Sequence, residues 1–179
     1  RKFLRERWKD KYRYYTNKKP HGITLRQLPI FTVMITWQCK SFPELSNEEL
    51  YSLLQLRIGV FVVEQNCSYQ DCDGKDLKAH HLCAWENDVL LAYTRLLPVG
   101  VSYDHAASIG RVITAPAARG KNLGRELMTR SIEEVYRLFG RIPITISAQL
   151  YLKRFYESFS FTQRGEPYLE DGIMHISMV

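Results

Sequence analysis

The sequence predicts a mixed α+β (α/β) domain in which strands and helices alternate along the chain. Short apolar runs that alternate or are rich in β-branched residues, bounded by turn residues, indicate strands. Two longer stretches carry apolar residues at the three- and four-residue spacing of an amphipathic helix. With 179 residues, 45% of them hydrophobic and 25% charged, the chain has the size and composition of one globular domain.

The first half of the domain is predicted to hold one strand and two helices. Apolar residues alternate over 31–37, which favours a strand. Ser46 and Glu49 have the spacing of a capping box, so a helix is expected to begin there. A second, short helix is predicted at 60–64, with a strand as the alternative because this segment is β-branched and aromatic. The polar, acidic segment 65–76 is expected to be a loop.

The second half is predicted to place the remaining strands around a central helix. Residues 86–88 separate the two strands of a hairpin, and Pro116 ends the strand that precedes the central helix. Segment 98–106 is expected to be irregular. The predicted strands are 80–85, 90–97, 108–114, 142–146, 161–164 and 173–178, and the predicted helices are 123–139 and 148–159.

The turn at 115–125 is the candidate binding feature. A buried strand enters it and an amphipathic helix leaves it, so unpaired N–H groups and the positive end of the helix dipole converge there. Arg119, Lys121 and Arg125 add positive charge. These features suit a phosphate or pyrophosphate, with an ordinary turn as the alternative. The spacing fits neither a nucleotide P-loop nor the GxGxxG turn of dinucleotide folds.

Three segments carry a more specific pattern. The turn has Arg119, Asn122 and Gly124 at the spacing [RQ]-x-x-G-x-[GA], with asparagine at the middle glycine position. The other two are 57–77 (RIGVFVVEQNCSYQDCDGKDL), followed by His80 and His81, and 170–178 (EDGIMHISM). Together these segments resemble the ElaA-like branch of the GNAT superfamily of N-acetyltransferases over residues 34–179. The resemblance implies the GNAT acyl-CoA N-acyltransferase fold, a central twisted mixed sheet of about 6–7 strands flanked by helices.

The resemblance also implies acetyl-CoA as the cofactor. The central strand would pair with the pantetheine amides, and the turn would hold the pyrophosphate through backbone N–H groups. Asn122 tolerates the positive φ that this turn needs, but its side chain crowds the phosphate. The expected cofactor-binding residues are Val112, Ile113, Thr114, Arg119, Gly120, Lys121, Asn122, Leu123, Gly124, Arg125, Gln149 and Tyr156.

Acetyl transfer to an amine needs a neutral nucleophile, an oxyanion donor and a proton for the departing thiolate. By the resemblance, Tyr156 is the expected proton donor, and a core tyrosine is the alternative. Glu64 is the candidate base, although it could instead cap a loop or pair with Arg57. His81, or its neighbour His80 on the other face of the strand, is a candidate proton relay. The residues expected to contact the acceptor are Arg57, Phe61, Glu64 and Asp73.

We therefore predict an N-acetyltransferase that uses acetyl-CoA and transfers the acetyl group to a primary amine by direct attack in a ternary complex. The alternatives are a non-catalytic acyl-CoA-binding module and an acyl-homoserine lactone synthase-like acyltransferase. The expected partner is a small-molecule or peptide amine, and the expected assembly is a monomer or a homodimer. The cysteines Cys67 and Cys72 do not have zinc-ligand spacing to the histidines that follow, so no metal is expected.

Charge is divided unevenly along the chain. Residues 1–33 hold ten Lys and Arg against Glu6 and Asp10, which gives +8, whereas the fifteen basic and seventeen acidic residues of 34–179 give −2. We interpret 1–33 as a basic extension outside the domain, and contact with nucleic acid or a membrane is expected only through it. A mobile terminus, a short helix or upstream sequence before Met34 are the alternatives. The lack of CxxC pairs, of a long apolar run and of an apolar leader favours a cytoplasmic location.

Overall fold

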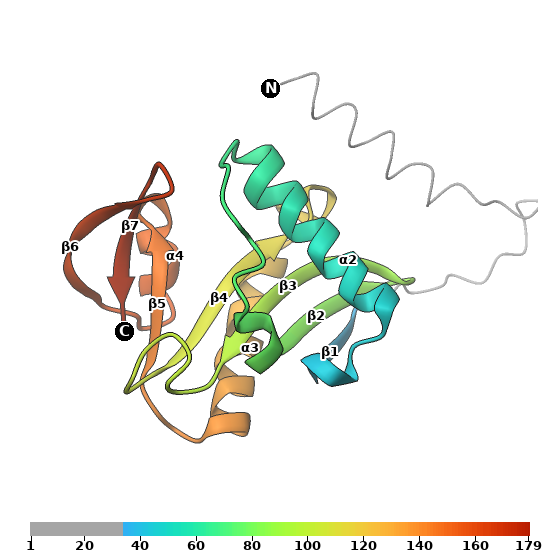
Figure 1. The fold of residues 1–179 in the computed structure, drawn as a ribbon, viewed down its shortest axis with the longest axis horizontal. Helices are drawn as coiled ribbons and strands as arrows, with labels where there is room; N and C mark the ends of the chain where they lie inside the picture. The colour runs from blue at the N-terminus through green and yellow to red at the C-terminus, as the bar shows by residue number, and fades with distance from the viewer. Residues whose placement is uncertain (1–33) are drawn as a thin grey trace, which may run out of the picture. The chain divides into compact units, whose positions relative to one another are not determined.

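The structure is a computed structural model and describes residues 34–179, so the predicted basic extension 1–33 lies outside the described residues. Seven strands form one mixed sheet in the order β1-β2-β3-β4-β5-β7-β6 (Figure 1). The strands are β1 (Thr36–Ser41), β2 (His80–Glu86), β3 (Val89–Leu97), β4 (Ala107–Thr114), β5 (Ile144–Gln149), β6 (Gln163–Glu170) and β7 (Ile173–Met178). The helices are η1 (Phe42–Glu44), α2 (Asn47–Arg57), η2 (Ile58–Glu64), η3 (Lys75–Lys78), η4 (Pro116–Ala118), α3 (Leu123–Phe139), η5 (Leu150–Leu152) and α4 (Lys153–Glu157).

The helix α2 begins at the predicted capping box. The Ser46 side chain accepts a hydrogen bond from the Glu49 N–H at 3.2 Å, and the Glu49 carboxylate accepts one from the Ser46 N–H at 2.8 Å. These two bonds satisfy N–H groups that a helix start leaves free. The chain then continues without a break into the π-helix η2, so the prediction of a second helix at 60–64 is confirmed.

The central strands and α3 also follow from local signals. Asn87 and Asp88 both have positive φ, 48° and 63°, as a two-residue hairpin turn requires. The apolar stripe of α3, which includes Leu127, Met128 and Val135, is buried. In Figure 1, α2 crosses in front of the sheet and α3 lies behind β3 and β4, so both faces of the central strands are covered.

Three elements near the C-terminus differ from the predicted ones: β5, α4 and β6. The strand β6, predicted at 161–164, covers Gln163–Glu170. The helix predicted at 148–159 is wrong at its start, because Ala148 and Gln149 extend β5 and pair with Ile176 and His175 of β7. The α-helix itself covers only Lys153–Glu157. Pairing with a strand that lies more than twenty residues later along the chain therefore overrides local helix propensity here.

Candidate functional site

A cavity opens where β4 and β5 stop pairing with each other. Their parallel pairing consists of Ala107 with Ile144 and Ser108 with Thr145. Beyond these residues β5 pairs with β7 instead, and β4 and β5 diverge from each other (Figure 1). The cavity between them measures about 690 Å³. Over the described residues the β4 edge that lines it has no neighbouring strand, so its backbone groups are available to an extended ligand that carries amides.

The strand β4 contains a β-bulge inside this cavity. Tyr93 of β3 pairs with Ile113, whereas Arg95 pairs with Gly110, so two residues of β4 lie opposite one of β3. One of the two, Arg111, has a φ of 54°, an uncommon value for a side-chain-bearing residue in a strand. Bulges re-aim backbone groups and are frequent beside active sites.

The turn that follows β4 ends in an open helix N-terminus. Gly120 and Asn122 have φ values of 80° and 61°, which fold the chain back towards α3. The hydrogen bonds of α3 begin with the Arg125 N–H, which donates to Asn122 O at 3.1 Å. The N–H groups just before Arg125 therefore face out of the helix end, as in an anion site. A Cβ at Gly124 would lie 3.8 Å from Thr114 Cγ2, which shows how close this end lies to the cavity-lining strand.

Comparison with known proteins identifies the family. Residues 55–179 match the family model described as "Acetyltransferase (GNAT) domain". The chain belongs to the GNAT family. Protein ElaA of Escherichia coli strain K12 is 46% identical over 147 residues, which are 81% of this chain and 95% of ElaA. The predicted membership in the ElaA-like branch of GNAT is thus confirmed.

Solved structures agree with this assignment. The crystal structure of an acyl-CoA N-acyltransferase from Pseudomonas aeruginosa is 47% identical, has a TM-score of 0.77 and covers 81% of this chain and 98% of that chain. The predicted GNAT acyl-CoA N-acyltransferase fold is therefore confirmed. The AHL synthase LasI, with a TM-score of 0.67 and coverage of 82% and 89%, is only 13% identical and shows the fold alone.

The GNAT cavity brings together several of the residues predicted for the cofactor and the acceptor. Gln149 of β5 lines it, and its amide donates to Gln65 Oε1 at the end of η2 at 3.1 Å. Residues 120–125 form the adjoining turn and the first residues of α3. The predicted residues that line the cavity are Phe61, Glu64, Asp73, Val112, Ile113, Thr114, Arg119, Gln149 and Tyr156.

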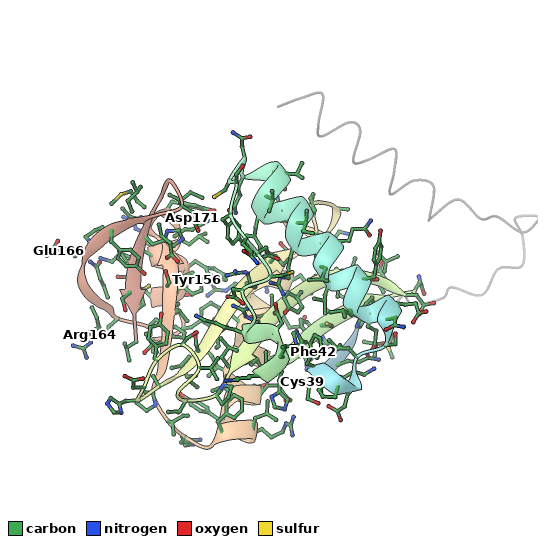
Figure 2. All side chains as sticks on the ribbon, in the orientation of Figure 1. Cys39, Phe42, Tyr156, Arg164, Glu166 and Asp171 are labelled. Atoms are coloured by element: carbon green, nitrogen blue, oxygen red, sulfur yellow. The ribbon has the colours of Figure 1, made fainter. Side chains whose placement is uncertain are left out.

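Tyr156 of α4 reaches into the gap between β4 and β5 (Figure 2). Its side chain is 7% exposed and contacts Phe155 and Phe161 edge to face, with ring centroids 5.1 and 6.2 Å away. Burial raises the pKa of Tyr156 to about 12, so the phenol keeps its proton at neutral pH. The hydroxyl has no hydrogen-bond partner among residues 34–179, so it is free to serve a ligand in the cavity.

Glu64 and Arg119 form an ion pair across one rim of the cavity. Arg119 donates from both Nη atoms, at 2.6 and 2.9 Å, to the two carboxylate oxygens of Glu64. Both side chains are about two-fifths exposed, so the pair is weakly held. The alternative of a Glu64–Arg57 pair is therefore wrong, because Glu64 pairs with Arg119 and Arg57 pairs with Asp71 and Asp76.

The predicted proton relay does not reach the cavity. The His81 side chain is fully buried, with Nδ1 2.8 Å from the Tyr93 hydroxyl and Nε2 3.2 Å from the Asp76 carbonyl. Burial lowers its pKa, which keeps the ring neutral. The neighbouring His80 points the other way, against Phe139 of α3. The geometry therefore argues against the prediction of His81 as a catalytic residue and assigns the ring to the core.

Arg57, also expected to contact the acceptor, is fully buried and lies in an ion-pair network. Its Nε donates to Asp71 Oδ2 at 2.8 Å, and its Nη1 donates to Asp76 Oδ1 at 2.7 Å. Arg95 of β3 and Arg111 of β4 complete the network. The expectation for Arg57 is corrected: its side chain joins the acidic loop 71–76 to the end of α2, and it is not among the residues that line the cavity.

Asp73 does line the cavity, but its charge is matched. Both carboxylate oxygens accept from Arg95, at 2.7 and 2.8 Å. Burial alone would raise the pKa of Asp73, but hydrogen bonds from Arg95 hold this pKa well below its usual range. An acceptor ammonium would have to compete with this bidentate pair, so the geometry weakens the prediction that Asp73 binds the acceptor.

Sequence reasoning missed the two arginines that face the acidic loop. Arg95 and Arg111 each interrupt an otherwise apolar strand, LLAYTRLL and SIGRVIT. A charged residue within a buried strand needs a partner of opposite charge, and the loop 71–76 holds three aspartates. Two arginines in buried strands and three aspartates in one loop are therefore a sequence signal that predicts this ion-pair network.

Two further properties bear on function. Among residues 34–179 no group of three or more His, Cys, Asp or Glu side chains is arranged to hold a metal ion. None of the helices in this part of the chain is long and apolar enough to cross a membrane.

Proposed function

We propose that this GNAT protein transfers the acetyl group of acetyl-CoA to a primary amine by direct attack in a ternary complex. The observation that carries the proposal is the edge of β4 that no strand of residues 34–179 pairs with, which lies opposite β5 and ends at the open N-terminus of α3. An extended chain of amides with a pyrophosphate at one end matches both parts of this surface.

The proposed contacts follow the shape of the cavity. The backbone of Val112, Ile113 and Thr114 pairs with the pantetheine arm, and Gln149 donates or accepts on the opposite wall. The backbone N–H groups from Arg119 to Arg125 hold the pyrophosphate. Each charge-assisted hydrogen bond contributes about 1.5–3 kcal/mol, so several of them outweigh the imperfect fit of one asparagine.

The proposed chemistry uses three groups of the chain. A backbone N–H at the β4 bulge stabilises the oxyanion that forms when the amine nitrogen bonds to the acetyl carbon. As the C–S bond breaks, the Tyr156 hydroxyl donates its proton to the thiolate. Glu64 accepts the amine proton once Arg119 turns from it to the pyrophosphate. This role requires the exposed Glu64–Arg119 ion pair to open when the cofactor binds.

Two measurements together test the function. Acetyl-CoA is expected to raise the melting temperature of the protein, and a panel of small amines and peptides is expected to release free thiol with formation of the acetylated amine. A thermal shift without turnover on any amine would favour the acyl-CoA-binding module. Consumption of S-adenosylmethionine without acetylation of simple amines would favour the lactone synthase-like alternative.

The replacement Asn122→Gly is expected to tighten binding of coenzyme A about two- to tenfold. Asn122 holds a φ of 61° at the proposed phosphate site, where glycine adopts the same backbone without strain and leaves the N–H groups uncovered. Titration calorimetry measures the dissociation constant.

A matched control is Asn87→Gly, which changes an asparagine at a φ of 48° in the β2–β3 turn. This control should leave the affinity unchanged. Equal affinities for Asn122→Gly and the unaltered protein would show that the asparagine side chain does not crowd the anion.

A further inference from the structure

Four carboxylates of residues 34–179 line the cavity, and they differ in whether a basic side chain pairs with them. They belong to Glu64, Asp73, Glu170 and Asp171. Glu64 pairs with Arg119, and Asp73 pairs with Arg95, each through two hydrogen bonds. The two that remain are consecutive residues at the turn between β6 and β7.

Glu170 is held by neutral groups only. The Ser147 hydroxyl donates to Glu170 Oε2 at 2.8 Å, and the Tyr168 hydroxyl, 2.6 Å from the Ser147 oxygen, donates in turn to that oxygen. Within residues 34–179 no Lys or Arg lies within 4 Å of this carboxylate. Glu170 is thus oriented by a chain of hydroxyls, and no basic side chain of the described residues matches its charge.

The opposite wall of the cavity lies close to this turn. The Asp171 carbonyl accepts a hydrogen bond from Cys67 Sγ at 3.0 Å, which joins the β6–β7 turn to the loop after η2 (Figure 2). Burial, together with nearby Tyr168 and Glu170, raises the pKa of Tyr103, which lines the cavity. Glu170 and Asp171 both line the cavity, and both are exposed at its rim.

The remaining cationic side chains of the cavity are accounted for elsewhere. Arg111 pairs with Asp71 at 2.7 Å. The Lys75 ammonium donates to the Ser102 hydroxyl at 3.1 Å, beside the Arg95–Asp73 pair. Among residues 34–179, the cavity-lining charges without an ionic partner are then one positive, Lys75, and two negative, Glu170 and Asp171. The end of the cavity at the β6–β7 turn is consequently negative.

We infer that Glu170 and Asp171 bind a positive charge on the acceptor, and that the acceptor class is a small diamine or polyamine. The inference rests on the proposed function. The attacking amine must be neutral, so a carboxylate pair that no arginine neutralises best serves a second amine that stays protonated. An amino acid would instead bring a carboxylate towards two like charges.

A series of three four-carbon amines tests the inference. 1,4-Diaminobutane, butylamine and 4-aminobutanoate present the same primary amine, while the far end is an ammonium, a methyl or a carboxylate. The expected order of kcat/KM with acetyl-CoA is diamine, then butylamine, then aminobutanoate. The step from the ammonium to the methyl is expected to lower kcat/KM about tenfold to a hundredfold.

Two variants test whether Glu170 and Asp171 cause the preference for the diamine. Glu170→Gln keeps an oxygen that accepts from Ser147 and removes the charge. Asp171→Asn removes the negative charge of the neighbouring residue. Each is expected to lower kcat/KM for the diamine about tenfold and to leave the rate with butylamine nearly unchanged. The control Glu166→Gln removes a carboxylate from the outer side of β6, away from the cavity (Figure 2). It should leave kcat/KM for both amines unchanged.

A binding measurement separates this inference from the proposed function. Titration of 1,4-diaminobutane into the protein saturated with coenzyme A is expected to show binding that Glu170→Gln weakens. Equal rates for the three amines, or a preference for 4-aminobutanoate, would overturn the inference and leave the transferase in place. Binding of acetyl-CoA without acetylation of any amine or peptide would instead overturn the proposed function.

Discussion

Replacing Tyr156 with phenylalanine is expected to lower kcat about a hundredfold, while KM for acetyl-CoA changes little. A positioned proton donor contributes about 10²–10⁴-fold to a rate, and the lower end applies because water in the open cavity can substitute in part. The ring itself is held by Phe155 and Phe161, so phenylalanine should pack in the same place and keep the fold.

The measurement is turnover at saturating acetyl-CoA, followed as thiol release. Tyr136→Phe on α3, which removes a hydroxyl outside the cavity, is the matched control and should keep full activity. Because the pKa of Tyr156 is raised to about 12, its ionisation should produce no fall in kcat between about pH 7 and 10. Undiminished turnover of Tyr156→Phe would remove the assigned role.

The parts of the fold that the sequence predicts are those that depend on neighbours in the chain. The capping box at Ser46, the hairpin turn at Asn87 and the apolar stripe of α3 are local patterns, and each element forms where its pattern lies. The strand–turn–helix at 108–125 is local too, which is why the sequence alone suffices to locate the candidate phosphate site.

Long-range pairing sets what the sequence could not predict. The strand β5 extends to Gln149 because β7 supplies hydrogen bonds, and that extension turns Gln149 and Ser147 towards the cavity. The sequence also could not predict that no arginine of residues 34–179 pairs with Glu170. Which arginine pairs with which carboxylate depends on where β3 and β4 place Arg95 and Arg111 beside the loop 71–76.

The predicted polar residues show the same limit. Arg57 and His81 have side chains suited to catalysis or binding, but both are fully buried and hydrogen-bond to residues 71–76. Asp73 does line the cavity, and its carboxylate is paired with Arg95. The resemblance to GNAT proteins could not tell a structural role from a catalytic one, because charged and polar residues occur in both structural networks and active sites. The burial of each side chain and its hydrogen-bond partners distinguish the two roles.

The second large effect is expected for Arg57→Met, which should lower the free energy of unfolding by about 3–5 kcal/mol. The guanidinium is fully buried and joins Asp71 to Asp76, with N–O distances of 2.8 and 2.7 Å. Its loss leaves two carboxylates with fewer donors in the interior. Arg57→Lys keeps the charge but not the planar fork, so an intermediate loss is expected.

Urea denaturation at pH 7 measures this difference. Arg137→Met breaks an ion pair of similar length, 2.6 Å, on the exposed face of α3 and is expected to cost at most about 1 kcal/mol. Similar losses for Arg57→Met and Arg137→Met would contradict the structural role of the buried arginine.

The same network predicts how stability depends on acid. Burial alone would raise the pKa of Asp76, but hydrogen bonds from Arg57 hold this pKa below its ordinary value. Hydrogen bonds from Arg95 lower the pKa of Asp73 in the same way. Carboxylates with a lowered pKa stabilise the fold above their unfolded value, so stability should fall as the pH drops below about 4. In Arg57→Met that acid-induced fall should be shallower, because Asp76 then titrates closer to its unfolded value. An unchanged acid profile would show that Arg57 does not set the charge state of the loop.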